Sequence, residues 1–260
     1  MTLRTDLSDP DLESPLVGKA VTAHIRSRGP DGFDCAVYDA GTSRARDALL
    51  PHVIAHELAG GTAPPEWARG DTVIALVVGV SDGADGDYGR LMLSVTAPEL
   101  VERLLTGFVE EILDGKVVIK GVARAAGTRS KVAVAPAGPG VDAREACTGR
   151  GATRIEGVER LLNRTFGGEK LEIVEYSGDR ATFLANAMRP VEVAGILVDR
   201  EDAVVAVEPH RSSGGVEEEN LNARLAGSLT GLSVRVVAAG TDLRQEIERL
   251  VAERPPAETA

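Results

Sequence analysis

The sequence predicts an α+β fold, with a small closed β-barrel first and a repeated unit of helices and strands after it. Two observations predict this order. Short alternating apolar runs lie between turn residues before Pro98, and a mixed helix and strand pattern after Pro98 occurs twice. A hydrophobic content of 43% over 260 residues is enough for packed cores, so we expect a globular chain rather than a disordered one.

Five strands are expected before Pro98, because five short apolar runs are each bounded by turn residues. The glycine-rich segment 81–89 is expected to form a tight hairpin before the last of them. Five short strands spaced in this way favour a closed barrel of the OB type. The expected strands lie at 18–27, 32–41, 48–57, 70–81 and 88–95.

The pattern becomes helical at Pro98, a residue favoured in the first turn of a helix. Apolar residues at positions 100, 104, 105, 108 and 112 share one face and predict a helix over 98–112. Strands follow at 116–126 and 130–136, then helices at 142–147 and 152–162, and then a strand at 169–177.

The same order then returns, which predicts an internal repeat. Its second copy has a helix at 179–188, strands at 191–199 and 203–210, a helix at 220–229 and a strand at 232–240. A last helix is expected over 242–253, with Asp242 and Gln245 placed as a capping pair.

Composition narrows the function classes. The net charge of −11 argues against a protein that coats nucleic acid nonspecifically. Residues 98–178 carry 12 basic and 12 acidic side chains and are the only neutral part of the chain. No apolar run reaches the roughly 18 residues of a membrane helix, and the first residues are polar and acidic, unlike a signal peptide. We therefore expect a cytoplasmic protein without membrane contact.

Metal, disulfide and catalytic motifs are not recognisable. Cys35 and Cys147 have no C-x-x-C spacing, so neither a disulfide framework nor a zinc site is expected. His52 and His56 are four residues apart, but no third ligand accompanies them. There is no G-K-[ST] phosphate loop, complete dinucleotide fingerprint or Ser/His/Asp set in a familiar context. We expect no metal, no cofactor and no enzymatic activity.

The segment CTGRGATRIEGVERLL, residues 147–162, places two glycines around one arginine between two expected helices. Each glycine inside a helix costs about 1 kcal/mol relative to alanine. In one interpretation Gly149 and Gly151 merely end one helix and start the next, with the arginines solvated. In the other, a ligand approaches this backbone closely. Spacing alone favours the first interpretation, since a short isolated motif is weak evidence.

Several motifs in register resemble the NusA family of bacterial transcription termination and antitermination factors. They are GVARAAGTRSKVAVAP, VDAREACTGRGATR, GGEKLEIVEYSGDRATFLANAM and NARLAGSLTG, and the similarity covers about 16–237. The resemblance implies an S1-type OB-fold barrel followed by two tandem type II KH domains. The implied parts are a disordered tail at 1–14, the S1-type domain at 15–97, the first KH domain at 98–178, the second KH domain with a degenerate loop at 179–243, and a C-terminal helix and tail at 244–260.

A KH domain holds a G-x-x-G loop between two helices, where backbone N–H groups meet the phosphates of about four unpaired nucleotides. The resemblance places this loop on Gly149, Arg150, Gly151 and Ala152, with alanine in place of the last glycine. This favours the ligand interpretation of the two glycines. It also implies that nearby basic side chains contact phosphates, namely Arg154, Arg129 and Lys131.

In the second KH domain the aligned loop falls on Glu217, Glu218, Glu219 and Asn220. Three carboxylates there would repel phosphate; alternatively, they favour the positive N-terminal end of the next helix. Either way we expect no ordinary RNA binding at this loop.

In the barrel, the resemblance implies that Phe33 and His52 are exposed to RNA as a stacking aromatic and a histidine. The alternative for Phe33 is a place in the barrel core. Trp67 is expected to pack in a loop.

The expected function is that of a NusA-like RNA-binding protein acting in transcription elongation, termination or antitermination through nascent single-stranded RNA. Its affinity is expected to be weak and to lie mainly in the first KH domain. RNA polymerase and other transcription factors are further candidate partners. The family begins with a polymerase-binding domain that this sequence is expected to lack. The alternative is a NusA-derived protein-interaction module that has lost most of its RNA affinity.

Overall fold

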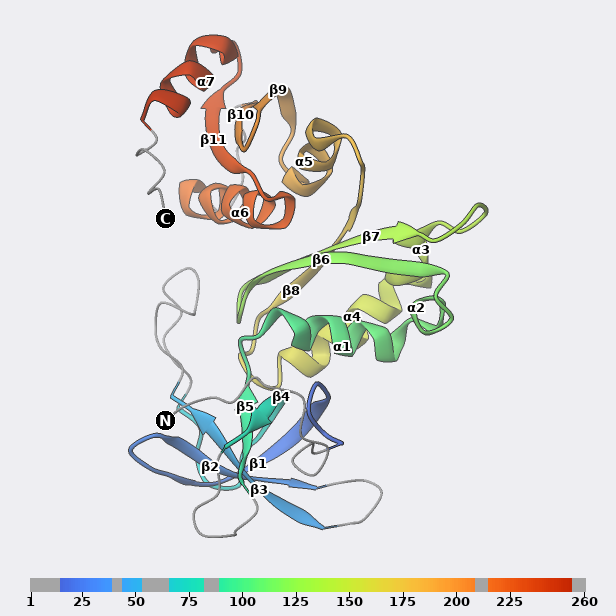
Figure 1. Ribbon diagram of the computed structural model, residues 1–260, viewed down its shortest axis with the longest axis vertical. Helices are drawn as coiled ribbons and strands as arrows, with labels where there is room; N and C mark the ends of the chain where they lie inside the picture. The colour runs from blue at the N-terminus through green and yellow to red at the C-terminus, as the bar shows by residue number, and fades with distance from the viewer. Residues whose placement is uncertain (1–14, 39–43, 53–65, 82–88, 209–214, 254–260) are drawn as a thin grey trace. The chain divides into compact units, whose positions relative to one another are not determined.

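The computed structural model describes residues 15–38, 44–52, 66–81, 89–208 and 215–253, without the side chains of 215–217. The chain divides into two compact units, and the division passes through the first copy of the repeat. The first unit comprises 1–114, 124–130 and 147–171, and the second comprises 115–123, 131–146 and 172–260. Strands and helices are mixed in both units, as an α+β fold requires (Figure 1).

The first five strands form a closed barrel in the order β1-β2-β3-β5-β4. β3 and β5 pair in parallel and the other neighbours are antiparallel. Inward positions alternate along each strand, so Phe33, Cys35 and Val37 of β2 all lie in the barrel core. The predicted OB-type barrel is confirmed. Its strands are β1 (Ala20–Arg28), β2 (Gly32–Tyr38), β3 (Ala45–Pro51), β4 (Thr72–Val80) and β5 (Leu91–Ser94).

The third strand begins earlier than the sequence predicts. It spans Ala45–Pro51 rather than 48–57, because β2 pairs with it along its whole length, from Gly32 opposite Pro51 to Tyr38 opposite Ala45. Near its start the strand has the polar residues Arg46 and Asp47, so its beginning lacks the apolar pattern that predicts a strand. The exposed Asp47 accepts a hydrogen bond from Arg26 of β1. Residues 53–57 of the predicted strand lie outside the described residues, as do residues 82–88 of the hairpin expected over 81–89.

The first copy of the repeat has the predicted order of elements. Its strands form a sheet in the order β6-β7-β8. β7 and β8 run in parallel, because the Lys170 amide bonds the Thr128 carbonyl and the Tyr176 amide bonds the Val134 carbonyl. The elements are α1 (Pro98–Phe108), α2 (Glu110–Leu113), β6 (Val117–Ala125), β7 (Arg129–Pro136), α3 (Ala143–Thr148), a 3-10 turn (Arg150–Ala152), α4 (Thr153–Leu162) and β8 (Lys170–Glu175).

The predicted helix over 98–112 is broken at Val109, whose backbone is extended at φ −118° and ψ 99°. The Val109 side chain is fully buried, and its N–H still caps α1 by donating to the Leu105 carbonyl. Burying this β-branched side chain turns the chain out of α1 and starts α2 in a new direction. Periodicity alone could not reveal the break, because apolar positions continue across it.

α1 and α4 pack directly against each other (Figure 1). Gly157 of α4 permits this approach, since a Cβ atom there would lie 2.4 Å from Cε1 of Phe108. The helix that follows the loop region is therefore held against α1 through a glycine contact.

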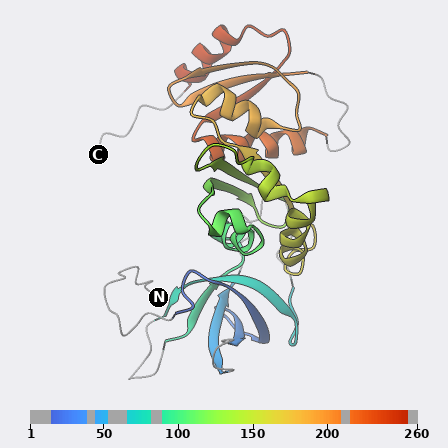
Figure 2. The same ribbon diagram turned by 90° about the vertical axis from the view of Figure 1, so that its right-hand side faces the viewer.

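The second copy repeats this plan with its sheet in the order β11-β10-β9. β9 pairs antiparallel with β10, and β11 pairs parallel with it. α5 and α6 pack together on one face and α7 covers the other (Figures 1 and 2), which is why every residue of β10 is buried. The elements are α5 (Arg180–Met188), β9 (Val193–Asp199), β10 (Asp202–Val207), α6 (Gly215–Thr230), β11 (Ser233–Ala238) and α7 (Leu243–Ala252).

Both copies of the repeat contribute to a single core within the second unit. Ala133 of β7 and Val174 of β8 pack in the same apolar cluster as Leu184 of α5, Val205 of β10 and Ala226 of α6. Because the two copies share this core, they are not structurally independent of each other. The α7 helix begins as expected at Asp242, whose carboxylate accepts hydrogen bonds from the Arg244 and Gln245 amides.

Candidate nucleic-acid interface

The turn between α3 and α4 has an unusual backbone. Gly149, Gly151 and Ala152 all have positive φ, at 73°, 62° and 63°. The Ala152 amide donates to the Gly149 carbonyl at 3.1 Å, which closes the turn. Glycine adopts such angles freely, and this explains Gly149 and Gly151 directly. Neither glycine lies inside a regular helix, so the helix penalty that made them puzzling does not apply.

Ala152 has the left-handed conformation that L-residues other than glycine rarely adopt, at a cost of about 1 kcal/mol or more. It is also the residue before the first turn of α4, and its side chain provides no cap for that helix. The first N–H groups of α4 therefore have no capping side chain at this residue, which leaves the positive end of the helix directed toward the turn.

Two arginines border this turn in different ways. Arg150 is exposed, whereas Arg154 is half-buried and its Nη1 donates to Oε2 of Glu111 at 2.7 Å. The stem of Arg154 also covers Gly149, because a Cβ atom at Gly149 would lie 2.8 Å from Cγ of Arg154. Gly149 is thus required by this contact as well as by its φ angle.

The other two basic residues are placed differently. Arg129 is half-buried at the start of β7 and, like the turn, belongs to the first unit. Lys131 is fully buried in the second unit, where its Nζ donates to Glu172 and, at 2.9 Å, to the Arg189 carbonyl. This corrects the expectation for Lys131, because an ammonium group held away from solvent by a carboxylate cannot reach a phosphate.

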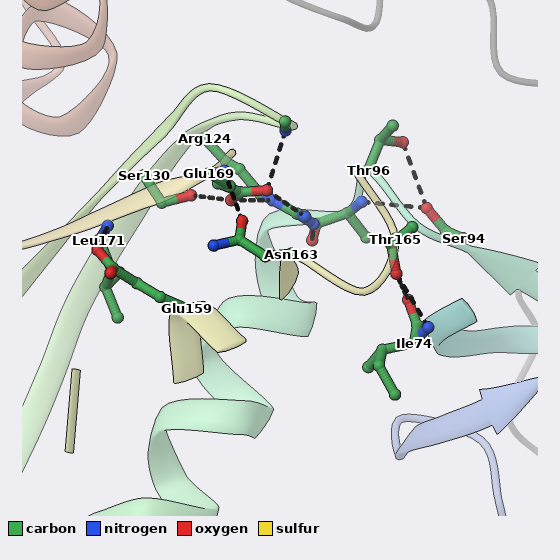
Figure 3. A network of polar contacts seen from close by, with 12 residues as sticks. Ile74, Ser94, Thr96, Arg124, Ser130, Glu159, Asn163, Thr165, Glu169 and Leu171 are labelled. Atoms are coloured by element: carbon green, nitrogen blue, oxygen red, sulfur yellow. Dashed lines mark hydrogen bonds and ion pairs between the residues drawn. The ribbon is translucent and has the colours of Figure 1, made fainter. Parts of the chain in front are cut away.

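A buried ion pair holds the β6–β7 turn and the start of β8 in place (Figure 3). Arg124 of β6 donates from Nε and Nη2 to both oxygens of Glu169, at 2.8 and 2.9 Å, and both side chains are at most 1% exposed. The Ser130 hydroxyl and the Gly127 amide donate to the same carboxylate at 2.6 and 3.0 Å. Nothing in the sequence distinguishes Glu169 from surface glutamates, so this network was missed.

The surroundings of Glu169 determine its charge. Burial by itself would raise the pKa of this carboxyl, but hydrogen bonds and the charge of Arg124, with the Ser130 and Gly127 donors, outweigh burial and hold the pKa below its usual value. Arg124 also donates from Nη1 to the Ala97 carbonyl at 2.9 Å, just before α1. One charged pair therefore connects the start of α1, the β6–β7 turn and the start of β8.

The barrel contacts the end of α4 through a second set of polar contacts (Figure 3). The Thr165 hydroxyl accepts a hydrogen bond from the Ile74 amide at 3.0 Å and donates to the Ile74 carbonyl at 3.3 Å. The Trp67 indole N–H donates to the Thr165 carbonyl at 3.3 Å. Trp67 thus packs in the way the sequence predicts for a loop residue, and its ring lies 5.3 Å from that of Phe33.

In the barrel, Phe33 is 3% exposed and belongs to the core. Its ring meets that of His52 edge-on at 5.6 Å, and His52 Nε2 lies 3.1 Å from the Gly29 carbonyl. The expectation of an exposed stacking ring at Phe33 is corrected in favour of the core alternative. His52 is half-buried. Strand alternation explains the outcome, because Phe33 falls on the same inward face as Cys35.

The same alternation places a different aromatic side chain outside. Tyr38 is 56% exposed at the end of β2, and its ring meets that of His24 of β1 edge-on at 5.3 Å. If Phe33 points inward, strand alternation predicts that the even-numbered residues of β2 point outward, and Tyr38 is the aromatic residue among them. Sequence reasoning passed over this pair.

The second copy of the repeat differs at the position of the turn. Glu218, Glu219 and Asn220 lie in the continuous helix α6, so the loop that the sequence places on residues 217–220 is helical. This corrects the position expected for that loop. The acidic residues occupy the first turns of α6, where negative side chains are favoured by the positive end of a helix.

The remaining candidate residues have ordinary explanations. Burial raises the pKa of Cys35 and of Cys147 to about 11, so both thiols are protonated at neutral pH. Within the described residues, no group of three or more His, Cys, Asp or Glu side chains is placed to hold a metal, and His56 lies outside those residues. Over that same part of the chain, no helix has the length and apolarity needed to cross a membrane.

An OB-type barrel precedes two copies of a repeat whose last strand pairs in parallel with the strand before it. The first copy has two helices before its last strand, α3 and α4, and the glycine turn lies between them. This order of elements is the one expected for tandem KH domains. Residues 95–176 match the family model described as the NusA-like first KH domain. Over these residues the chain is similar to the first KH domain of NusA.

Curated relatives agree with that match. The "Transcription termination/antitermination protein NusA" of Mycobacterium tuberculosis is 38% identical over 173 residues, which cover 65% of this chain and 48% of the relative. The protein of the same name from Bacillus subtilis is 37% identical over 158 residues, covering 60% and 41%. That of Thermus thermophilus is 37% identical over 170 residues, covering 64% and 43%. The chain therefore spans less than half the length of these relatives.

Proposed function

We propose that this chain is a NusA-like RNA-binding factor that acts in transcription elongation, termination or antitermination through nascent single-stranded RNA. The observation that carries the proposal is the turn of residues 149–152. Gly151 leaves the backbone open, Arg150 is exposed beside it, and α4 starts directly after the turn without a side-chain cap. Backbone N–H groups at a helix start, next to a cation, suit the phosphates of unpaired RNA.

In this proposal the first KH domain supplies most of the affinity, and the affinity is weak. Arg150 provides the main phosphate contact, Arg154 contributes from the edge of the turn, and Arg129 contributes from the start of β7. The helical 217–220 segment provides no corresponding cradle in the second KH domain. RNA polymerase and other transcription factors are further proposed partners, since the relatives are transcription termination/antitermination proteins.

A second candidate function is a protein-interaction module that has lost most of its RNA affinity. Three observations favour it: Ala152 replaces a glycine in the turn, Glu111 pairs with Arg154, and carboxylates stand in the first turns of α6. The two functions predict different effects of salt concentration on RNA affinity. Phosphate contacts make the logarithm of the affinity fall linearly with the logarithm of the salt concentration, and a protein-only module gives no RNA binding to titrate.

Fluorescence anisotropy with a labelled single-stranded RNA of about ten nucleotides, long enough for two KH domains, tests the proposal. We expect Arg150→Glu to weaken binding of all sequences and to flatten the salt slope, because it removes a phosphate contact and adds repulsion. Arg160→Glu is the matched control, since Arg160 is also exposed but lies in the last turn of α4. If Arg150→Glu has no effect while Glu218→Lys changes binding, the second KH domain carries the function instead.

A further inference from the structure

Glu111 holds Arg154 at the edge of the turn. The two side chains come from different elements, α2 and the first turn of α4, and each is 30% exposed. Nη1 of Arg154 lies 2.7 Å from Oε2 of Glu111. The break at the fully buried Val109 directs α2, and with it Glu111, away from the line of α1. Glu111 therefore lies in the short helix that starts after this break.

The position of Arg154 matters for the turn because its stem covers Gly149. A Cβ atom at Gly149 would lie 2.8 to 3.2 Å from the Cγ, Cδ and Cβ atoms of Arg154. The arginine is thus in contact with the first residue of the turn at one end and with Glu111 at the other. The guanidinium of Arg154 is a cation beside the proposed phosphate path. One of its N–H groups already donates to the Glu111 carboxylate.

The electrostatic influence of this pair extends to the end of α3. The pKa of the buried Cys147 thiol is raised first by burial and then by the negative charge of Glu111, while Arg154 opposes the increase. Both charged groups therefore act on the residue two positions before Gly149. A carboxylate so close to the turn also repels any phosphate that enters it.

We propose that Glu111 is a positioning residue that lowers the RNA affinity of the first KH domain, because it competes with phosphate for the guanidinium of Arg154. The inference rests on the proposed function, since it concerns the same turn. An RNA phosphate must displace or share the carboxylate before Arg154 can contribute. The Glu111 carboxylate thus competes with RNA phosphate at the turn that carries the exposed Arg150. Among the described residues, the corresponding segment of the second copy is helical and forms no such turn.

A double-mutant cycle in the full chain tests this role with the labelled RNA used above. We expect Glu111→Gln to tighten binding about two- to fivefold, the range that a partly exposed ion pair supports. The salt slope should become steeper by about 0.7, as for one added phosphate contact on a single strand. In an Arg154→Gln background, Glu111→Gln should change neither quantity, because the arginine through which it acts is gone.

Glu110→Gln is the matched control, as it removes the same charge from the neighbouring, exposed position of α2. Equal effects of Glu110→Gln and Glu111→Gln, or an unchanged effect in the Arg154→Gln background, would overturn the inference while Arg150→Glu could still uphold RNA binding. If the unmodified chain does not bind and Glu111→Gln does, the inference holds and the protein-interaction function is favoured for the unmodified chain. If no variant binds RNA, both proposals fail.

Discussion

At the scale of single residues, Ala152 is an alanine held in a left-handed backbone conformation, which costs conformational free energy. In the part of the chain that the structure describes, it shares a positive φ with only one other non-glycine residue, Arg200. Alanine in the left-handed region is disfavoured because its Cβ crowds the backbone. The fourth position of the turn therefore combines the backbone angle of a glycine with a side chain that hinders close approach.

We expect Ala152→Gly to stabilise the chain by about 1 kcal/mol, because glycine removes the left-handed penalty, although its flexible unfolded state offsets part of the gain. It should also tighten RNA binding. Arg200→Gly, in the β9–β10 hairpin with φ 51°, should give a similar gain in stability without any change in RNA binding. Urea unfolding and anisotropy measure both. A loss of stability in Ala152→Gly would show that the turn does not have the described backbone.

Glu169 is the residue whose charge the fold depends on most clearly. Because its pKa is held below the usual value, the unfolded chain binds a proton first as the pH falls. The stability contributed by the pair with Arg124 is therefore complete above the unfolded pKa and is lost as the pH falls through the lower, folded pKa.

Glu169→Gln should reduce the free energy of unfolding by about 3 to 5 kcal/mol at neutral pH, since it leaves Arg124 buried without its counter-charge. The difference from the unmodified chain should shrink as the pH falls below about 4 to 5, because the glutamate of the unfolded chain takes up a proton there while the folded one is still ionised. Urea unfolding across this pH range gives the comparison, with the exposed Glu175→Gln as a control that should change little. A difference that stays constant with pH would contradict the assigned charge.

At the scale of elements, two helical glycines show how packing decides what a methyl group does. Gly107 is exposed near the end of α1, and a Cβ atom there would meet nothing within 4 Å. Gly227 is buried where α6 crosses β11, and a Cβ atom there would lie 2.7 Å from the Leu232 carbonyl oxygen. A backbone atom cannot move aside as a side chain can.

The same substitution should therefore have opposite effects at these positions. Gly107→Ala should stabilise by about 0.5 to 1 kcal/mol through helix propensity. Gly227→Ala should destabilise by about 1 to 3 kcal/mol, because the added methyl group overpacks the helix–strand contact. Thermal unfolding followed by circular dichroism tests the pair. A gain in stability from Gly227→Ala would mean that α6 and β11 are not as close as described.

At the scale of the whole molecule, the barrel, α1, α2 and α4 belong to one compact unit. The Thr165 hydroxyl is central to this connection, because it satisfies both backbone groups of Ile74 in the barrel. The chain has a single tryptophan, Trp67, and its indole bonds the Thr165 carbonyl. Its fluorescence therefore reports on this connection.

Thr165→Val should reduce the free energy of unfolding by about 1 to 3 kcal/mol, because the buried Ile74 amide loses its partner. The denaturant midpoint followed by Trp67 fluorescence should fall accordingly. Thr165→Ser keeps the hydroxyl and should remain close to the unmodified chain. Equal midpoints for Thr165→Val and the unmodified chain would mean that the contact contributes nothing to the unit.

The sequence by itself determined the order of elements, because hydrophobic periodicity and turn residues are local. The barrel strands, both copies of the repeat and the capped last helix follow from spacings that a reader can count. It also identified the turn at Gly149, since glycines between two helical patterns need a backbone reason. The match of residues 95–176 to the NusA-like first KH domain agrees with the motifs that suggested it.

Only the tertiary structure decided which charged and aromatic side chains are available at the surface. Lys131 and Arg150 look alike in the sequence, yet one is buried on Glu172 and the other is exposed. Phe33 belongs to the core, and residues 218–220 are helical. Glu169 and Glu111 meet arginines 45 and 43 residues away in the chain. Such partners are set by packing between distant segments, and no local pattern encodes a contact whose two halves are brought together only when the core forms.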